Sequence, residues 1–370
     1  MPARITLLNE TAAALAPEER KLFGRFFDFA MSEARVLPPK AMEGWIAGAF
    51  KYLAPTPEGV LEAIRRQPIV HVVNRITGQA TLFNAIRSQR PIEAKGEGDL
   101  AKEIEAAKPK CSFCKPLELT PANTFGRIGE TKTCANVAAY DGYHGLVIFE
   151  DHSPLRFRHD EFAPAEIADL FAASKAWAEK AHAEDPQARF FFLMWNCLWK
   201  AGASIIHGHA QMTVGRKFHY GKVERLRRDA LAYAAQYGSN YFDDFVKVHE
   251  ALGLAVRYGG VAAVAHLTPA KEREIVLLAE RFESPDLPRA LHRALKVYAR
   301  QDVKSYNLAV YMPPLGAPDP GWKGFPCLVH LVDRGDPTAK TADVGAMEMY
   351  ASAVVSADPF QLAEAMKENS

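Results

Sequence analysis

The residues best suited to chemistry lie in one segment, Gly202-Ala-Ser204-Ile-Ile-His207-Gly-His209-Ala-Gln211. Residues two apart in a strand project to the same face, so His207, His209 and Gln211 are expected on one side. A lone histidine in such a strand is more often a hydrogen-bonded core residue, but three alternating polar side chains favour a site. The small-residue turn lets backbone N–H groups approach a phosphate, Ser204 and Gln211 can donate to its oxygens, and an imidazole can attack phosphorus.

A second feature is the pair Cys111 and Cys114, separated by two residues. This spacing fits a zinc site, a redox pair or two buried thiols. A closed zinc site needs four ligands, and the sequence has no second pair of this kind, so histidines must complete it. Spacing alone leaves four histidines open as partners: His144, His152, His159 and His207.

A third feature is a pair of arginines, Arg87 and Arg90, which directly follow a predicted strand. Guanidinium groups three residues apart at a strand end can converge on one phosphate and bind it in a bidentate manner. The alternative is that both arginines face solvent. Without the other two features, we would prefer this alternative.

Helical patterns dominate residues 1–66, which we interpret as an N-terminal helical extension. Apolar residues recur at helical spacing between Pro17 and Val36, and shorter helical patterns cover 41–53 and 58–66. The character of the sequence then changes. The runs 69–73 and 80–83 are rich in β-formers and predict the strands with which a sheet begins.

The remaining chain divides into two similar parts, residues 67–215 and 216–370. Each predicts a strand, a helix and two more strands in that order, and each carries a histidine in its last strand, His209 and His330 respectively. We therefore expect an α+β fold built from duplicated halves, with a mainly antiparallel sheet, helices packed on it, and a degenerate second half.

Composition excludes several classes of protein. Among 370 residues, 48% are hydrophobic and 24% charged, so the chain is not mainly disordered. A net charge of +1 provides no field for non-specific nucleic-acid binding, and the basic stretch 217–229 is interpreted as a solvated helix face. The longest apolar stretch, 190–199, is half of the roughly 20 residues that a membrane span needs. Five cysteines and no export signal favour a cytoplasmic protein.

Taken in order, these motifs resemble the galactose-1-phosphate uridylyltransferases, a branch of the histidine-triad superfamily. Most spacings agree from Asn74 to Gln211, while residues 1–66 have no counterpart. Five blocks carry the resemblance: Asn74-Arg-Ile-Thr77-Gly78, Asn84-Ala-Ile-Arg87-Ser-Gln-Arg90-Pro91, Cys111-Ser-Phe-Cys114, Asp151-His152-Ser153, and Asn196-x5-Gly202-x-Ser204-x2-His207-x-His209-x-Gln211.

The resemblance implies roles for individual residues. His209 would be the nucleophile that accepts a nucleotidyl group. Four residues would bind one structural zinc ion: Cys111, Cys114, His152 and His207. The others would hold phosphoryl oxygens (Asn196, Gly202, Ser204 and Gln211), neutralise phosphates (Arg87 and Arg90), or border the base and ribose (Phe113 and the loop around Asn136).

Several positions depart from the family pattern. Gly208 replaces the proline between the two histidines, and Val137 replaces an acid that contacts the ribose. The segment 340–348, which corresponds to the hexose-binding segment, lacks its tyrosine. A second metal site in some members uses two histidines of a late strand. Only His330 remains here, with Leu328 at the other position, so we expect that second site to be absent.

The resemblance implies a ping-pong exchange through a nucleotidyl-histidine, with UDP-glucose and galactose 1-phosphate as the first expected partners. One alternative is an adenylyl-transferring phosphorylase that acts on an ADP-sugar or a dinucleoside polyphosphate. Another is a zinc-stabilised nucleotide-binding protein without catalysis. Because sites of this family borrow residues across a subunit interface, the resemblance also implies a homodimer.

Overall fold

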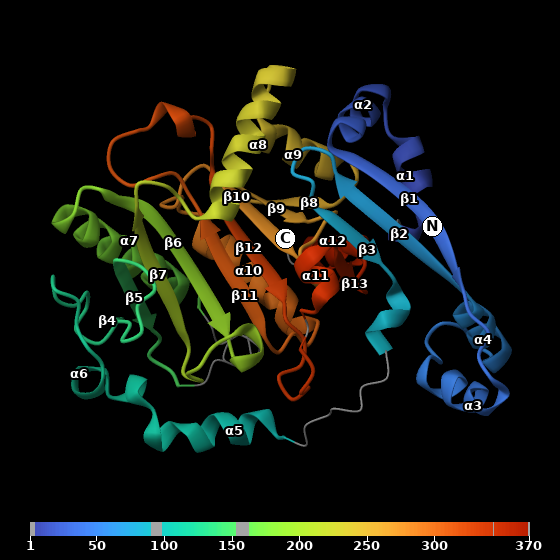
Figure 1. The fold of residues 1–370 in the computed structure, drawn as a ribbon, viewed down its shortest axis with the longest axis horizontal. Helices are drawn as coiled ribbons and strands as arrows, with labels where there is room; N and C mark the ends of the chain where they lie inside the picture. The colour runs from blue at the N-terminus through green and yellow to red at the C-terminus, as the bar shows by residue number, and fades with distance from the viewer. Residues whose placement is uncertain (1–3, 90–97, 153–162, 343, 369–370) are drawn as a thin grey trace.

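The computed structural model describes residues 4–89, 98–152, 163–342 and 344–368, which form two β-sheets with helices around them (Figure 1). The smaller sheet has the strand order β1-β2-β3-β13, formed by Phe27–Arg35, Arg66–Asn74, Ala80–Phe83 and Ala353–Val355. The larger sheet has the order β4-β5-β7-β6-β11-β12-β10-β9-β8, formed by Thr133–Ala135, Tyr143–Ile148, His209–Arg216, Ala188–Cys197, Tyr306–Tyr311, Cys327–Asp333, Ile275–Ala279, Val261–Ala265 and Ala255–Tyr258.

The N-terminal region is less helical than predicted. After α1 (Leu8–Ala14), the helix expected to run to Val36 ends as α2 (Pro17–Phe26), and the next nine residues form β1. β1 pairs antiparallel with β2, from Phe27 opposite Asn74 to Arg35 opposite Arg66. The prediction was wrong here because the phenylalanines fit a helical spacing up to Phe26 but alternate from Phe27 onward, and β2 supplies the hydrogen-bonding partner.

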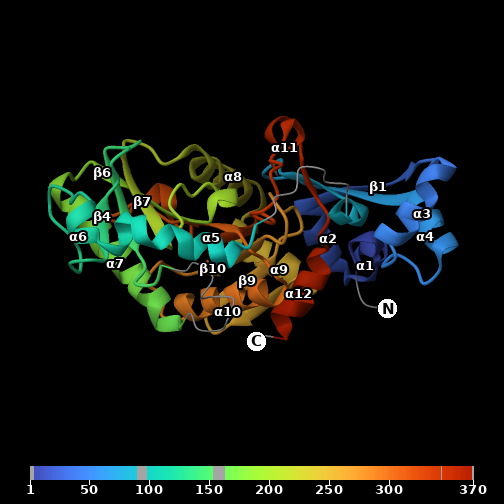
Figure 2. The same ribbon diagram turned by 90° about the horizontal axis from the view of Figure 1, so that it is seen from below.

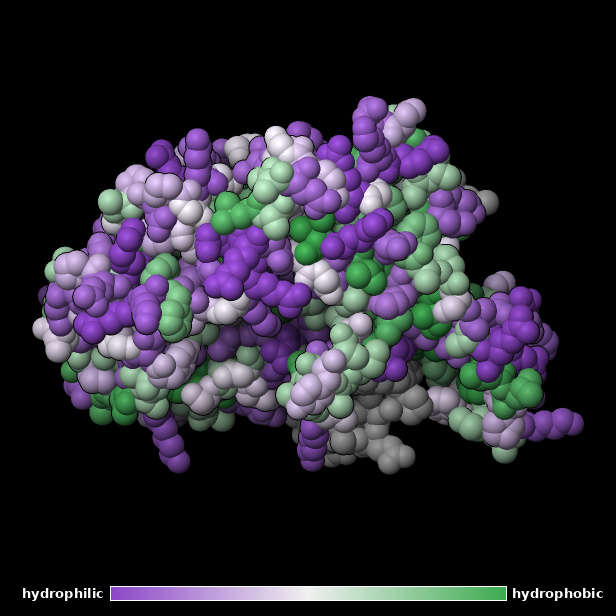
Figure 3. Space-filling view, turned by 45° about the horizontal axis from the view of Figure 1, so that its top comes forward, coloured by the Kyte–Doolittle hydropathy of each residue, from purple (hydrophilic) through white to green (hydrophobic). Residues whose placement is uncertain are grey.

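The two shorter helices of this region are confirmed as α3 (Lys40–Ala49) and α4 (Pro57–Arg65). They share a small separate core of four buried apolar side chains: Ile46, Phe50, Val60 and Ile64. Figure 1 shows the pair at the end of the β1–β2 ribbon that points away from the large sheet. In Figure 3, hydrophilic residues cover most of the larger sheet's side, while hydrophobic residues are more frequent toward this ribbon.

The large sheet is assembled from two similar parts, as the sequence predicted. The first consists of β5, α7 (Pro164–Glu184), β6 and β7, and the second of β10, α10 (Leu287–Arg300), β11 and β12. Their strands follow the mirrored orders β5-β7-β6 and β11-β12-β10, so the two parts meet where β6 pairs antiparallel with β11. At this junction Asn196 lies opposite Asn307.

Helices cover one face of the large sheet, where α7 and α10 pack on each other and on the strands (Figure 2). The helix predicted for the first half is α7, whose apolar face is buried through Ile167, Leu170, Trp177 and Ala178. No helix in the described ranges has the length and apolarity to cross a membrane. The remaining helices are α5 (Leu100–Ala107), α6 (Pro116–Leu119), α8 (Gly221–Tyr237), α9 (Tyr241–Ala251), α11 (Ala346–Tyr350) and α12 (Pro359–Lys367).

Candidate active site and metal centre

Four side chains from three separate segments converge beside the start of β7: Cys111, Cys114, His152 and His207. Their ligand atoms all lie within 4.8 Å of one another. The Nδ1 atom of His207 is 3.5 Å from each sulfur, and the Nδ1 atom of His152 is 3.4 Å from the Cys114 sulfur. Zinc bond lengths at tetrahedral angles require sulfur-to-nitrogen separations of about 3.6 Å, so the donor set and its spacing fit a tetrahedral metal ion.

Both histidines of this cluster are oriented by backbone carbonyl groups. The Nε2–H of His152 donates to the Ile104 oxygen at 2.9 Å, and that of His207 donates to the Phe149 oxygen at 2.7 Å. Because these bonds place the proton on Nε2, each ring keeps the Nδ1 lone pair that faces the cysteines. Both rings are also buried, so the four residues could hold a metal ion without further rearrangement.

The other interpretations of the cysteine pair fare less well. His144 lies away from the cysteines, in contact with Asn136 and Gln211, and His159 is outside the described residues. Burial and the neighbouring Cys111 raise the pKa of the Cys114 thiol, whereas a reactive redox cysteine requires a lowered one. The geometry therefore favours metal binding over redox chemistry.

The strand expected to carry His207, His209 and Gln211 begins only at His209, because the preceding residues bend toward the two cysteines. The bend is held by His207 and by a hydrogen bond from the Phe149 N–H to the Gly208 oxygen at 3.0 Å. A Cβ atom on Gly208 would lie 2.5 Å from the Phe149 ring. The glycine that replaces the family's proline is thus required by the close approach of Phe149.

His209 is buried at the first position of β7, and its environment leaves one nitrogen with a lone pair. Its Nδ1–H donates to the His207 carbonyl oxygen at 2.8 Å, so Nε2 is unprotonated in the neutral ring. Burial lowers the pKa of His209, which keeps the imidazole neutral near pH 7. The edge of Phe113 packs on the ring, with the centroids 5.0 Å apart. The arrangement provides an oriented neutral imidazole with a free nucleophilic nitrogen.

Of the predicted phosphate-binding residues, Asn196 lies in β6 and Gln211 in β7, while Gly202 and Ser204 lie in the segment that joins β6 to β7. Ser204 and Gly202 are exposed there, and Gly202 adopts a left-handed conformation with φ of +97°. The second half of the chain supports this segment. The Asn307 amide donates to Asn196 Oδ1 at 2.7 Å and to the Ala201 oxygen at 2.8 Å. Sequence reasoning missed Asn307, since nothing in its own strand marks it as a partner of Asn196.

The two predicted arginines are not brought to His209 by the contacts that the structure describes. Arg87 is exposed in the short helix η2 (Ala85–Gln89). Burial opposes ionisation of Glu348 in α11, but the backbone hydrogen bond from Gly345 and, more weakly, the charge of Arg87 lower the pKa of this carboxyl. Arg90 lies outside the described residues.

The histidine of the second half has different surroundings. The Nδ1–H of His330 donates to Glu274 Oε1 at 3.0 Å, and His266 contacts the other oxygen of the same buried carboxylate at 3.2 Å. His330 and Glu274 line a cavity of about 590 Å³ between the two sheets, with Leu328 beside them. The cysteine pair of the first half has no equivalent there, and Glu274 was not anticipated because its partners are distant in sequence.

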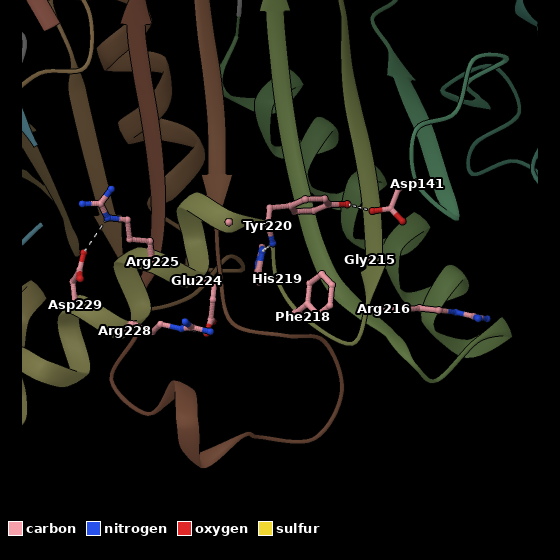
Figure 4. A pocket seen from close by; sticks show the side chains of 11 residues that line it. Asp141, Gly215, Arg216, Phe218, His219, Tyr220, Glu224, Arg225, Arg228 and Asp229 are labelled. Atoms are coloured by element: carbon pink, nitrogen blue, oxygen red, sulfur yellow. Dashed lines mark hydrogen bonds and ion pairs between the residues drawn. The ribbon is translucent and has the colours of Figure 1, made fainter. Parts of the chain in front are cut away.

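A second cavity, of about 710 Å³, lies at the other end of β7, around Gly215 and the start of α8 (Figure 4). In the basic stretch that lines it, Glu224 pairs with Arg227 and Arg228, and Asp229 lies 3.9 Å from Arg225. The hydrogen bonds from Arg227 and Arg228 outweigh desolvation and hold the pKa of Glu224 at about 2. The cations of α8 are therefore matched by acids of the same helix.

Solved structures with the same architecture are known. An ADP-glucose phosphorylase from Arabidopsis thaliana, with bound ADP-glucose, has a TM-score of 0.61 and 17% identity over 80% of this chain and 97% of that chain. A GalT-like protein from the same plant gives 0.56 and 18% over 70% and 92%, and a uridylyltransferase gives 0.54 and 16% over 81% and 98%. This chain has the uridylyltransferase fold. The predicted resemblance is thus confirmed at the level of the fold, although no family model and no curated protein matches the sequence.

Proposed function

We propose that this protein is a nucleotidyltransferase in which His209 forms a covalent nucleotidyl-histidine. The observation that carries the proposal is the hydrogen bond from His209 Nδ1–H to the His207 carbonyl oxygen, which leaves Nε2 as the free nucleophile. The fold shared with an ADP-glucose phosphorylase and a uridylyltransferase supports the same chemistry. A neutral imidazole attacks phosphorus without a separate base, and the phosphoramidate it forms stays reactive.

The proposed reaction consists of two half-reactions. Nε2 of His209 bonds to the α-phosphorus of a nucleoside diphosphate sugar, and the P–O bond to the sugar phosphate breaks, so that the sugar phosphate leaves with the electron pair. An oxygen of a second phosphate then attacks the same phosphorus and releases His209. Charge that develops on the phosphoryl oxygens would meet donors from Ser204, Gln211 and Asn196, where losing one such donor typically costs about 3 kcal/mol.

We assign the metal site to zinc with a structural role. Cys111, Cys114, His152 and His207 would fill all four tetrahedral positions, which leaves none for substrate. Since His209 is hydrogen-bonded to the backbone of His207, a fixed His207 would also fix the nucleophile.

Two bases are the first candidates for the nucleotide donor. UDP-glucose with galactose 1-phosphate follows from the sequence motifs, while ADP-glucose is the molecule bound in the structurally similar phosphorylase. Arg87, which makes no described contact with His209 in its own chain, would serve the site of the other subunit in the homodimer that the resemblance implies. Sedimentation analysis tests the dimer, and a monomer with full activity would remove Arg87 from the site.

The test is the intact mass of the protein after exposure to UDP-, ADP-, GDP- and CDP-glucose without an acceptor, beside a His209→Ala control. We expect an acid-labile gain of one nucleotidyl group with one of the donors, and none in the control. Folded, zinc-loaded protein that binds a donor but gains no mass would instead support the non-catalytic nucleotide-binding alternative.

A further inference from the structure

A buried histidine outside the assigned roles lies between two predicted substrate-contacting side chains. His144 is 3% exposed in β5, and its Nε2 atom is 3.1 Å from Gln211 Oε1 and 3.1 Å from the Asn136 side-chain nitrogen. The Tyr140 ring covers it, with the two centroids 4.1 Å apart. Two segments that are distant in sequence, residues 136–144 and strand β7, therefore meet at one imidazole.

The protonation state of His144 follows from its contacts. Burial lowers its pKa, so the ring is neutral and carries one proton. Its Nδ1 atom is buried and has no hydrogen-bond partner among the described residues. A proton on Nδ1 would thus be a buried, unsatisfied donor, and Nε2 would then present a lone pair to the Gln211 oxygen. The proton belongs on Nε2, from which it is donated to Gln211 Oε1. The Asn136 side-chain nitrogen, which is also 3.1 Å from Nε2, then makes no hydrogen bond to the ring.

This bond determines how the Gln211 amide is turned. Its Oε1 accepts from His144 and faces the Tyr140 hydroxyl at 3.4 Å, so the oxygen end is held on the side of β5. The amide nitrogen keeps both protons for another acceptor, since no described residue accepts from it. Gln211 lies two residues after His209 and so shares its face of β7. A phosphoryl group attached to His209 is an acceptor on that face.

The surroundings of His144 are themselves held in place. β5 pairs with β7 so that Leu146 lies opposite Gln211, and the Asn136 N–H donates to the His144 oxygen at 3.0 Å. The loop that carries Tyr140 is fixed at its next residue, Asp141, which accepts a hydrogen bond from Tyr220 (Figure 4). The imidazole is therefore fixed by the strand, the loop and the adjacent Tyr140 ring.

Stability alone does not account for this histidine. A buried ring with an unpartnered nitrogen is less favourable than an apolar side chain of similar volume, which would pack under Tyr140 without an orphaned polar atom. What only a histidine supplies here is a donor to Gln211 at the required distance.

We propose that His144 is a positioning residue that turns the Gln211 amide nitrogen toward the phosphoryl oxygens during nucleotidyl transfer. The inference rests on the proposed function, because it concerns the same reaction at His209. It predicts an effect on the rate of transfer and little effect on donor binding, since the bond to Gln211 contributes when charge develops on the phosphoryl group.

The test compares three replacements of His144 in zinc-loaded protein, by the single-turnover rate of His209 labelling and by donor affinity. His144→Phe keeps the ring but removes the donor, and we expect labelling on the order of 10²-fold slower with unchanged affinity. His144→Gln places an amide N–H close to the position of Nε2 and should recover most of the rate. His144→Asn is one methylene shorter and should not.

A matched control is His71→Phe, because His71 also has one unpartnered ring nitrogen, in its case Nε2, but lies in β2 of the small sheet. This variant should label at the wild-type rate. Wild-type labelling in His144→Phe would overturn the inference. So would equal slowing in the Gln and Asn variants, because it would show that ring packing, and not the hydrogen bond, matters.

Failure of the proposed function is distinguishable. If wild-type protein is never labelled, the transfer reaction is wrong, and ¹⁵N-edited NMR of the histidine rings decides the arrangement by itself. An Nε2–H tautomer of His144 whose signal shifts in Gln211→Ala supports the positioning contact, whereas an Nδ1–H tautomer overturns it.

Discussion

The two halves of the large sheet place a histidine in equivalent last strands but surround it differently. In the first half, His209 donates to a backbone carbonyl beside a cluster of two cysteines and two histidines. In the second half, His330 donates to the buried carboxylate of Glu274, which also contacts His266. One ring is oriented by a neutral group next to a metal site, and the other is bound to an anion.

This difference shows how the same arrangement of strands can give two histidines different hydrogen-bond partners and so suit them to different roles. A carbonyl partner orients His209 without adding charge, so Nε2 of the neutral ring keeps its lone pair, as the proposed nucleophile requires. Burial opposes ionisation of Glu274, but the charge of His266 and the hydrogen bonds from His266 and His330 outweigh it and lower the pKa of this carboxyl. The second half in turn supports the first, because Asn307 holds Asn196 across the β6–β11 junction.

The largest expected effect comes from removing the metal site. Structural zinc contributes on the order of 10 kcal/mol in small zinc domains, so Cys111→Ala with Cys114→Ala should abolish metal binding and lower the thermal midpoint by roughly 10 °C or more. Hydrogen exchange should show lost protection in β5 and β7 while β10 and β12 stay protected. Cys134→Ala, which removes a buried thiol outside the cluster, is the control. Equal zinc content in the double variant and the wild type would contradict the site.

The next effect separates the two histidines directly. His209→Ala should lower turnover by about 10⁴-fold or more, as loss of a nucleophile does in other covalent enzymes. His330→Ala should keep turnover within about tenfold of wild type, because it touches no group of the transfer site. Steady-state assays with the donor found by labelling decide this. A comparable loss in both variants would break the division between the halves.

A smaller effect concerns the stability of the second half. Glu274→Gln places an amide NH₂ against N–H groups of Ala270, His266 or His330, and breaking such a buried arrangement should cost about 4 kcal/mol. Denaturant unfolding measures the loss, and labelling of His209 should proceed in the variant that remains folded. An unchanged free energy of unfolding would mean that the carboxylate is not what holds His330.

The smallest effect is a pH dependence from His219, which packs between Phe190 and Trp322 beyond the end of β7. Burial lowers its pKa from 6.5 to about 4, so between these values the unfolded state binds more protons and stability falls as pH falls. The group accounts for up to about 3 kcal/mol between pH 7 and 4. Unfolding of His219→Phe should show a flatter slope over this range, and an identical slope would exclude the assignment.

The residues that we propose to act in the first half could be predicted from the sequence because they stand in short motifs, and the structure brings the four predicted metal ligands together. Cys111 and Cys114 are close in sequence, His207 and His209 alternate, and the alternation itself indicates a shared face. The set of four metal-binding residues followed from the resemblance, since spacing alone could not choose His152 over His144 or His159. The duplicated order of strands and helices was visible for the same reason, as each element has its own periodicity.

What the sequence could not predict depends on partners far apart in the chain. Asn307 and Glu274 have no local signal, because their roles arise from pairing across β6–β11 and from the approach of His266 and His330. β1 was missed because its helical and alternating patterns overlap at Phe26 and Phe27, and only pairing with β2 decides between them. The late start of β7 reflects the bend before His209, where the Phe149 N–H donates to the Gly208 oxygen.

The central claim, that the two histidines differ in chemistry, is tested most directly by mapping the nucleotidyl group. Protein labelled with a nucleoside diphosphate sugar is digested under mildly basic conditions and the modified peptide is sequenced by mass spectrometry. The account predicts a phosphoramidate on His209 and unmodified His330. A nucleotidyl group on His330, or on any residue other than His209, would contradict it.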